Sequence, residues 1–196
     1  MAKMKPVSRN FQKNSIATLL IGLKLLLICA IVAGVVSLVF HVTKEQYEAN
    51  LQKTKDEAVA DIFGIEGLTT KALTAEGIKE TVYEVYGADA ALIGYCVEVE
   101  GKGFGGSIGL MVGYNSACEI VGVRVVAHSE TPGLGAKIKD ASFLDQYRGE
   151  TDEITLGEDV DAIGGATVSS RAVNDAVNRA SASLQEVLSM NGGAIR

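Results

Sequence analysis

The chain has 196 residues, 47% of them hydrophobic, which is enough for one domain with its own core plus an appendage. The first 40 residues hold five of the 18 basic residues and no acidic ones, so the remainder carries 13 basic against 24 acidic residues. Such an acidic domain is a poor partner for nucleic acid or for an acidic membrane surface. The three cysteines form no CxxC or CxxCH motif, which excludes recognisable iron–sulfur, c-type haem and zinc sites.

Residues 16–40 form one apolar segment, IATLLIGLKLLLICAIVAGVVSLVF, in which Lys24 is the only charged residue. A helix of about 20 apolar residues crosses the hydrocarbon core of a bilayer, so this segment is long enough with some tilt. The alternative is a cleavable signal peptide, whose apolar region is roughly 7–15 residues long and ends at a small-residue site. The segment is longer and continues into HVTKEQYEANLQKT without an A-x-A site, so we expect a retained transmembrane helix.

The tail before this helix, residues 1–15, is basic and contains Lys3, Lys5, Arg9 and Lys13. By the positive-inside rule, these cations keep the N-terminus in the cytoplasm and export everything after the span. Lys24 lies toward the cytoplasmic half, where its ammonium group can reach the headgroups. The sequence therefore predicts a single-pass protein of the cell (inner) membrane with a periplasmic or extracytoplasmic C-terminal domain.

Residues 41–64 are predicted to continue the membrane helix outward as a stalk. Apolar residues at helical spacing support this prediction, and Gly64 is placed to end the helix; they are Tyr47, Leu51, Ala58, Val59 and Ile62. A short stretch with helical potential follows as far as Glu80.

The periodicity then changes from helical to alternating. Residues 81–130 are rich in Val, Ile and Tyr, with breaks at 87–89, 101–103 and 115–117, so they read as four strands of an antiparallel meander. Cys96 and Cys118 fall on or near these strands, 22 residues apart. They could form one disulfide in an exported domain, but buried free thiols are at least as compatible with the sequence.

A loop, a short helix at residues 140–149 and a long final helix from about Ser170 to Leu188 complete the chain. The buried face of the final helix is predicted from residues at helical spacing, namely Val173, Val177, Ala180, Leu184 and Leu188. Residues 65–196 are therefore expected to form one α+β domain, an antiparallel sheet with flanking helices, behind a single N-terminal transmembrane helix.

Residues 161–173, DAIGGATVSSRAV, join a glycine turn to the start of this last helix. Gly164 and Gly165 let backbone amides approach a ligand, and a helix start offers free N–H groups and a positive dipole end. Three hydroxyl groups follow, on Thr167, Ser169 and Ser170, so the segment can bind an anion such as phosphate. The alternative is a glycine turn with a Ser/Thr N-cap and no ligand. Neither a P-loop lysine nor a GxGxxG pattern is present.

Residues 128–138, HSETPGLGAKI, form a second unusual segment directly after the last predicted strand. Pro132-Gly133 marks a tight turn, and Gly135 allows another close backbone approach. A purely structural turn after the last strand would require the Pro-Gly pair but not the polar residues around it. His128 by itself is expected to be an ordinary loop histidine.

These two segments, in this order, resemble hallmarks of the FMN-binding domain family, in which the threonine after Gly-Ala is esterified by FMN phosphate. GKGFGGSIGLMVG, residues 101–113, resembles a further segment of that family. The resemblance implies that Thr167 carries FMN covalently through a phosphoester. Gly164 stands where the family often has serine, which removes one hydroxyl but leaves Asp161, Ala166 and Thr167 intact.

The same resemblance implies further cofactor-binding residues. In the first segment they are Asp161, Gly165, Ala166, Ser169 and Ser170. In the second they are Glu130, Thr131, Leu134, Gly135 and Lys137. The helix amides and Ser169 or Ser170 would neutralise the phosphate charge. Attachment implies a separate flavin transferase that uses FAD and Mg²⁺ and reads residues 161–170.

From the tail to the final helix, the chain is similar to the G-subunit family of Rnf ion-translocating electron-transport complexes. This implies an electron-relay subunit of a membrane-bound ferredoxin:NAD oxidoreductase coupled to Na⁺ or H⁺ movement, working with the other subunits and without a catalytic site of its own. The C subunit of the sodium-pumping NADH:quinone reductase, whose chains are usually longer, and a free-standing exported flavin carrier are alternatives. A membrane-anchored binding or scaffold domain without cofactor is a different class, and it predicts a colourless protein.

Overall fold

A computed structural model describes residues 8–73 and 77–190, with side chains from residue 18 onward except residue 45. The start of the predicted basic tail, with Lys3 and Lys5, lies outside the described residues. The chain divides into two compact units, Met1–Asn50 and Leu51–Arg196, which we describe separately.

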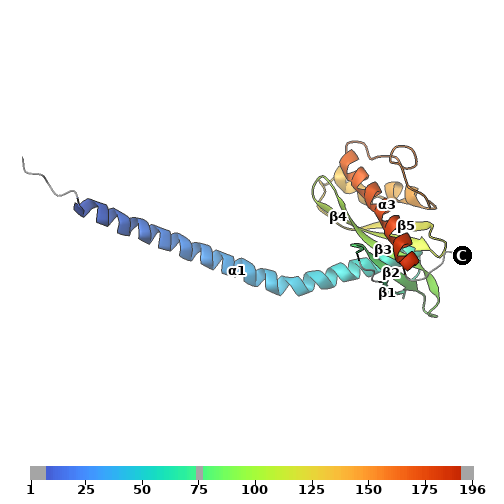
Figure 1. Ribbon diagram of the computed structural model, residues 1–196, viewed down its shortest axis with the longest axis horizontal. Coiled ribbons are helices and arrows are strands. Elements are labelled where there is room, and N and C mark those ends of the chain that lie inside the picture. Colours follow the sequence, from blue (N-terminus) through green and yellow to red (C-terminus); the bar gives the residue numbers. More distant parts are fainter. Residues whose placement is uncertain (1–7, 74–76, 191–196) are drawn as a thin grey trace, which may run out of the picture. The chain divides into compact units, whose positions relative to one another are not determined.

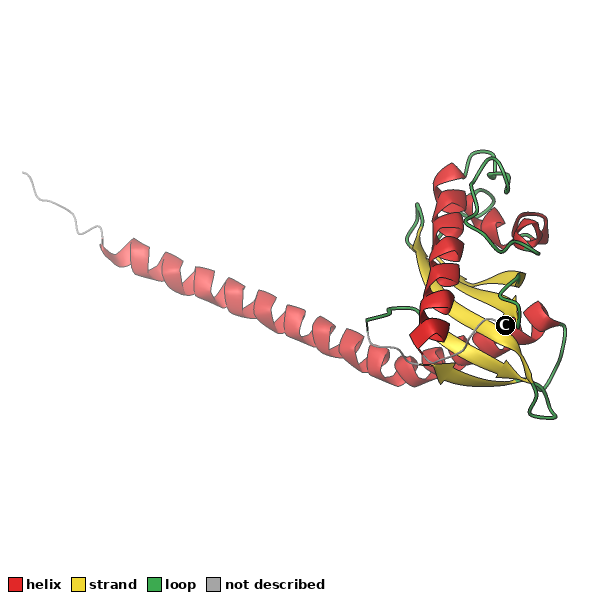
Figure 2. Cartoon of the chain, turned by 45° about the vertical axis from the view of Figure 1, so that its right-hand side comes forward, coloured by secondary structure: helices red, strands yellow, loops and turns green. Residues whose placement is uncertain are grey.

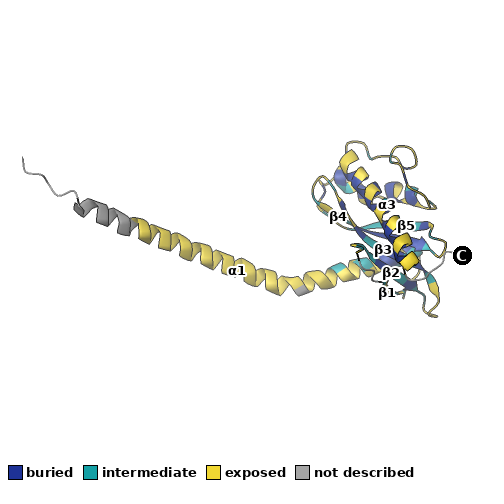
Figure 3. Ribbon diagram, in the orientation of Figure 1, coloured by how far each residue is buried: buried dark blue, intermediate teal, exposed yellow. Residues whose placement is uncertain are grey.

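The described part of the first unit, from residue 8 onward, belongs to one long helix, α1 (Ser8–Phe63) (Figure 1). Its apolar side chains are exposed on every side, among them Leu25 at 62%, Ile31 at 58% and Phe40 at 68% (Figure 3). Among the described residues, α1 supplies one helix long and apolar enough to cross a membrane. A helix that is apolar all round needs an apolar medium, which agrees with the transmembrane segment predicted at residues 16–40.

The second unit is built on a five-stranded antiparallel sheet in the order β1-β2-β3-β4-β5 (Figure 2). Its strands are β1 (Thr69–Leu73), β2 (Thr81–Tyr86), β3 (Leu92–Lys102), β4 (Ser107–Asn115) and β5 (Ile120–His128). The last four are the predicted meander. The helical potential read in residues 65–80 was wrong for β1, which pairs with β2 from Thr69↔Tyr86 to Leu73↔Val82. Five residues are too few to form a stable helix alone, so pairing with the neighbouring strand decides their structure.

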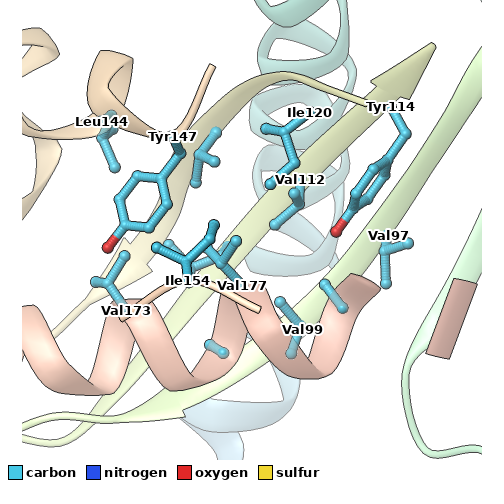
Figure 4. Packing of buried hydrophobic residues seen from close by; sticks show 14 of the residues in the cluster. Val97, Val99, Val112, Tyr114, Ile120, Leu144, Tyr147, Ile154, Val173 and Val177 are labelled. Atoms are coloured by element: carbon cyan, nitrogen blue, oxygen red, sulfur yellow. The ribbon is translucent and has the colours of Figure 1, made fainter. Parts of the chain in front are cut away.

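One face of the sheet is covered by α3 (Thr167–Met190), the predicted final helix, which starts three residues earlier than expected. Val173, Val177 and Leu184 of α3 are essentially inaccessible to solvent and pack in one cluster with Val97 and Val112 of the sheet (Figure 4). The short helices η1 (Gly135–Lys139), α2 (Ala141–Leu144) and η2 (Asp145–Tyr147) extend this core beside β5. The sheet and α3 thus hold the polypeptide that enters α3 in a fixed place.

The opposite face is covered by the last turns of α1. Ala58, Val59 and Ile62 are buried in a second cluster with Cys96 and Met111. Because side chains alternate along a strand, Cys96 faces this cluster, while the next residue on β3, Val97, faces α3. The helix end is also tied to the sheet by an ion pair of 2.7 Å between Lys55 and Glu98 and by a pair between Asp61 and Arg124. Gly64, with φ +66°, then ends α1, as expected of a C-terminal glycine.

Two truncations should separate the membrane segment from the domain. Deleting residues 1–40 removes nothing from the unit Leu51–Arg196, so we expect a soluble, folded, acidic domain. Deleting residues 1–64 also removes Ala58, Val59 and Ile62 and uncovers the second cluster, at a cost of roughly 4–6 kcal/mol for the lost burial. Thermal unfolding and gel filtration of the two proteins test this. Equal melting temperatures, or an insoluble 1–40 deletion, would contradict it.

The cysteines of the second unit are free. Cys96 is buried on the α1 face, whereas Cys118 packs against the cluster on the α3 face. Since the two thiols lie on opposite sides of the sheet, they form no disulfide in this fold. Burial raises the pKa of the Cys96 thiol to about 12, which keeps it protonated and unreactive.

Candidate functional site

The polypeptide enters α3 through a tight glycine turn. Gly165 has φ +80°, and the Ala166 N–H donates to the Ile163 carbonyl over 2.9 Å. Ser170 secures this turn from inside the helix, because its hydroxyl accepts from the Ile163 N–H at 3.0 Å and donates to the Ala166 carbonyl at 3.1 Å. The turn therefore brings Thr167 to the surface as the first residue of α3, where it is exposed.

The two glycines of this turn have different requirements. A Cβ on Gly164 would meet nothing within 4 Å, and its φ is not in the left-handed region. A Cβ on Gly165 would require a strained φ and would meet Leu134 Cδ1 at 3.0 Å. Only Gly165 has to be glycine, so the glycine at 164, where the related motif often has serine, does not alter the geometry of the turn.

The first turn of α3 has the features of an anion site. The first helical hydrogen bond runs from the Ser170 N–H to the Ala166 carbonyl, so the N–H groups of Thr167, Val168 and Ser169 precede the helical ladder. These N–H groups carry the positive end of the helix dipole. An anion bonded to the Thr167 hydroxyl would lie directly beside them.

A buried glutamate joins three segments under this turn. Glu130 is only 5% exposed, and its carboxylate accepts from the Ser169 hydroxyl at 2.6 Å and from the Gly105 N–H at 2.9 Å. Glycines make room for it, because a Cβ on Gly103 or Gly135 would lie 2.2 Å or 2.5 Å from a carboxylate oxygen. Glu130 therefore fixes the β3–β4 hairpin tip, the segment after β5 and the start of α3 relative to one another.

A cleft of about 380 Å³ lies where these three segments meet. Eight of the eleven residues predicted from the sequence line it: Glu130, Thr131, Leu134, Gly135, Gly165, Ala166, Thr167 and Ser169. Its volume is within the usual range for small-ligand sites, roughly 300–1,000 Å³. The structure thus brings most of the two predicted segments together around one hollow.

Three of the predicted residues do not line the cleft. Ser170 is fully buried and holds the turn, as described above. Lys137 is exposed on η1, and Asp161 is exposed with its N–H donating to the Gln146 side chain at 2.9 Å. His128, expected to be a loop histidine, is the last residue of β5, and its Nδ1 accepts from the Glu130 N–H at 3.2 Å.

Two lining residues were missed, Phe104 at 78% exposure and Val168 at 55%. Together with Leu134, which is 45% exposed, they give the cleft an apolar rim. The exposure of Phe104 could have been predicted from the sequence, because a large apolar residue between glycines at a hairpin tip cannot reach the core. The position of Val168 could not have been predicted in this way, since whether it points outward depends on the exact start of α3.

A larger hollow of about 540 Å³ lies between residues 151–153 and α3. Asp152, Glu153 and Arg179 line it, and Arg179 is already paired with Glu80 at 3.7 Å, so the two carboxylates leave a negative balance that disfavours a phosphate or another anion. The cleft at Thr167 is therefore the better candidate for an anionic ligand.

Comparison with known proteins identifies the family of the chain. Residues 103–182 match the model of the FMN-binding domain family. The chain is 34% identical over 167 residues to the G subunit of the ion-translocating oxidoreductase complex of Methanosarcina acetivorans, covering 80% of this chain and 88% of that protein. It is 31% identical over 188 residues to the corresponding G subunit of Shewanella oneidensis, covering 81% and 85%.

A third relative is the G subunit of the proton-translocating ferredoxin:NAD(+) oxidoreductase complex of Clostridium ljungdahlii, 35% identical over 108 residues, covering 52% of this chain and 57% of that protein. The crystal structure of Shewanella oneidensis NqrC matches with a TM-score of 0.51 and 24% identity, over 64% of this chain and 70% of that chain. At this identity the match concerns the fold alone. The family resemblance read from the sequence is confirmed: the chain belongs to the G-subunit family of ion-translocating oxidoreductase complexes.

Proposed function

We propose that this protein is a membrane-anchored electron-relay subunit that carries FMN on Thr167 through a phosphoester. The observation that carries the proposal is the position of Thr167, whose hydroxyl-bearing side chain is exposed on the first turn of α3 and lines the glycine-walled cleft. A threonine that served only as a helix cap would not need a cleft beside it.

The residues present fit a flavin phosphate. The N–H groups of Thr167, Val168 and Ser169 can hold the phosphate oxygens, and Gly165 keeps the backbone beside them free of a side chain. The apolar rim suits the flavin ring, while Glu130 and Thr131 supply polar groups at the wall. Ser169 already donates its hydroxyl to Glu130, and Ser170 bonds within the turn, so the amides are the main phosphate ligands in this proposal.

Attachment needs a second protein and a balanced transfer. The Thr167 hydroxyl oxygen forms a bond to the phosphorus on the riboflavin side of FAD, and the bond from this phosphorus to the bridging oxygen breaks. AMP leaves with that oxygen, and the hydroxyl proton is released. A flavin transferase with Mg²⁺ would catalyse this step and would recognise the exposed turn at residues 161–170, where Asp161 remains accessible. The ester link then prevents loss of a cofactor that an exported domain cannot replace.

When bound, FMN supplies reversible electron transfer, and the chain provides its place and its surroundings. The first turn of α3 holds the phosphate, and the cleft walls limit the approach of water to the ring. The basic tail places the domain outside the cytoplasm. Its electron donor and acceptor would be other membrane and peripheral subunits of an Rnf-type complex that couples ferredoxin and NAD to Na⁺ or H⁺ movement.

Three other assignments compete with an Rnf-type role. A subunit of a sodium-pumping quinone reductase and a free-standing exported flavin carrier would each bind the flavin in the same cleft. A scaffold domain would leave the cleft empty. Purification of the intact complex with its partners separates the first two from an Rnf-type role.

Expression of the full chain with and without a flavin transferase tests the proposal itself. With the transferase, we expect a yellow protein whose intact mass rises by one FMN less one water, and without it the mass of the bare chain. A bare-chain mass in the presence of an active transferase would overturn the proposed function and favour the scaffold class.

A further inference from the structure

Gln146 lies on η2, at the edge of the core. Its neighbours Leu144 and Tyr147 are essentially inaccessible to solvent and pack in one cluster with Val173 of α3 (Figure 4). These side chains fix α2 and η2 in place. Gln146 itself is half-buried, so its side chain extends from a rigid support to the surface.

The side-chain amide of Gln146 has one orientation that satisfies all of its contacts. Its Nε2 donates to the Ser142 carbonyl at 3.1 Å and to the Phe143 carbonyl at 3.4 Å. Its Oε1 accepts from the Asp161 N–H at 2.9 Å. The reversed amide would place two donors together at Asp161 and acceptors together at α2. The amide therefore links a fixed helical turn to the backbone of Asp161.

Asp161 begins the segment 161–170 that a flavin transferase would recognise. The backbone around it is held, because Val160 is only 1% exposed and the Ile163 N–H donates to the Ser170 hydroxyl at 3.0 Å. The Asp161 carboxylate, by contrast, is exposed and makes no hydrogen bond or ion pair within the part of the chain that the structure describes. A fixed backbone thus presents a carboxylate that is available to another protein.

We infer that Gln146 is a positioning residue for flavin attachment, because it holds Asp161 where a flavin transferase can bind it together with the Thr167 hydroxyl. This inference rests on the proposed function and leaves its chemical step unchanged. The Thr167 oxygen bonds to the riboflavin-side phosphorus of FAD, AMP leaves with the bridging oxygen, and the hydroxyl proton is released. Gln146 does not contact the reacting atoms. It raises the fraction of molecules whose recognition segment is already ordered, and the apparent affinity of an enzyme that binds only the ordered form scales with that fraction.

The substitution Q146M isolates this role. It keeps the length and the helix propensity of the side chain but removes both the donor and the acceptor. Loss of one hydrogen bond of this kind favours the disordered segment roughly two- to tenfold. Once the transferase has bound, the segment is ordered in either protein. We therefore expect Q146M to raise the KM of the transferase for this protein about two- to tenfold and to leave kcat within about twofold.

Initial rates of flavin transfer to the full chain measure this effect. The transferase, FAD and Mg²⁺ are held constant, the concentration of the full chain is varied in detergent, and product is counted by the intact mass of one added FMN less one water. Q146E keeps the length and an acceptor oxygen for the Asp161 N–H, so its KM should lie between those of wild type and Q146M. Amide hydrogen exchange at Asp161 should be faster in Q146M, because the N–H loses its acceptor.

The matched control is N115A. Asn115 Oδ1 accepts from the N–H groups of Ala117 and Glu119 at 2.9 Å and 3.0 Å. This turn lies at the opposite end of β4 from the hairpin tip that lines the cleft. N115A removes hydrogen bonds of the same kind and should lower the melting temperature at least as much as Q146M, with the KM unchanged.

Two results would overturn the role of Gln146 and leave the attachment standing. One is a wild-type KM in Q146M together with faster exchange at Asp161, since the transferase then does not need the hydrogen bond. The other is an equal rise of KM in Q146M and N115A, which marks a general loss of stability. A bare-chain mass in wild type with an active transferase would instead remove the proposed function itself.

Discussion

Thr167→Ala should abolish covalent flavin while leaving the domain folded. The substitution removes the only atom through which the phosphoester can form at this position, so the expected loss is complete rather than partial. Because Thr167 is exposed, the unfolding free energy should change by about 0.5 kcal/mol or less. Intact mass, visible absorbance and thermal unfolding measure both parts of this prediction.

Two hydroxyl variants are the controls. Thr167→Ser keeps an acceptor hydroxyl at the same backbone position and should restore at least part of the attachment. Ser170→Ala loses the bonds to Ile163 and Ala166, so it should loosen the turn and reduce the yield of flavin without abolishing it. Equal and complete loss in Thr167→Ala and Ser170→Ala would contradict a single acceptor.

Glu130→Ala should be the most damaging single substitution at the site for stability. It leaves the Gly105 N–H and the Ser169 hydroxyl without their acceptor in a buried place. Loss of two such bonds costs roughly 2–5 kcal/mol, which corresponds to a fall in melting temperature of roughly 5–15 °C for a domain of this size. Flavin yield should fall too, because the hairpin tip and the start of α3 lose their common anchor.

The conservative variant Glu130→Gln distinguishes this bridge from simple packing. It keeps the shape and one acceptor oxygen, and the Ser169 hydroxyl can rotate to accept from the new amide, so the cost should be about 1–2 kcal/mol. Ser169→Ala removes one of the two hydrogen bonds to Glu130, so it should also lower the unfolding free energy by about 1–2 kcal/mol. If Glu130→Ala melts like wild type, the bridge does not hold the cleft together.

Regular patterns in the sequence were enough to predict most of the fold. The alternation after residue 80 matches the strands of the meander, and the spacing of Val173, Val177 and Leu184 matches the buried face of α3. The strand β1 was missed, because a five-residue strand at an edge is specified by its partner and not by its own composition. The packing of α1 on the sheet also depends on tertiary contacts that its helical period does not reveal.

The lining of the candidate cleft was predictable to a similar extent. Glycine-rich turns with neighbouring hydroxyl groups are typical of sites where the backbone contacts a ligand. The two segments with this composition, residues 128–138 and 161–173, form two walls of the cleft. The separate roles of Ser169 and Ser170 could not be read, because adjacent residues on a helix point in different directions and only the structure places Glu130 beside one of them. The burial of Glu130 itself depends on a hairpin tip 25 residues earlier in the chain.

The most direct test of the account is to locate the flavin on the polypeptide. Cleavage after Arg148 and Arg171 releases residues 149–171 as one tryptic peptide, since no other lysine or arginine lies between them. From protein made with a flavin transferase, this peptide should carry the mass of one FMN less one water, and its fragment ions should place that mass on Thr167. Flavin on Ser169, on Ser170 or on any other peptide, or an unmodified peptide from a yellow protein, would contradict the account.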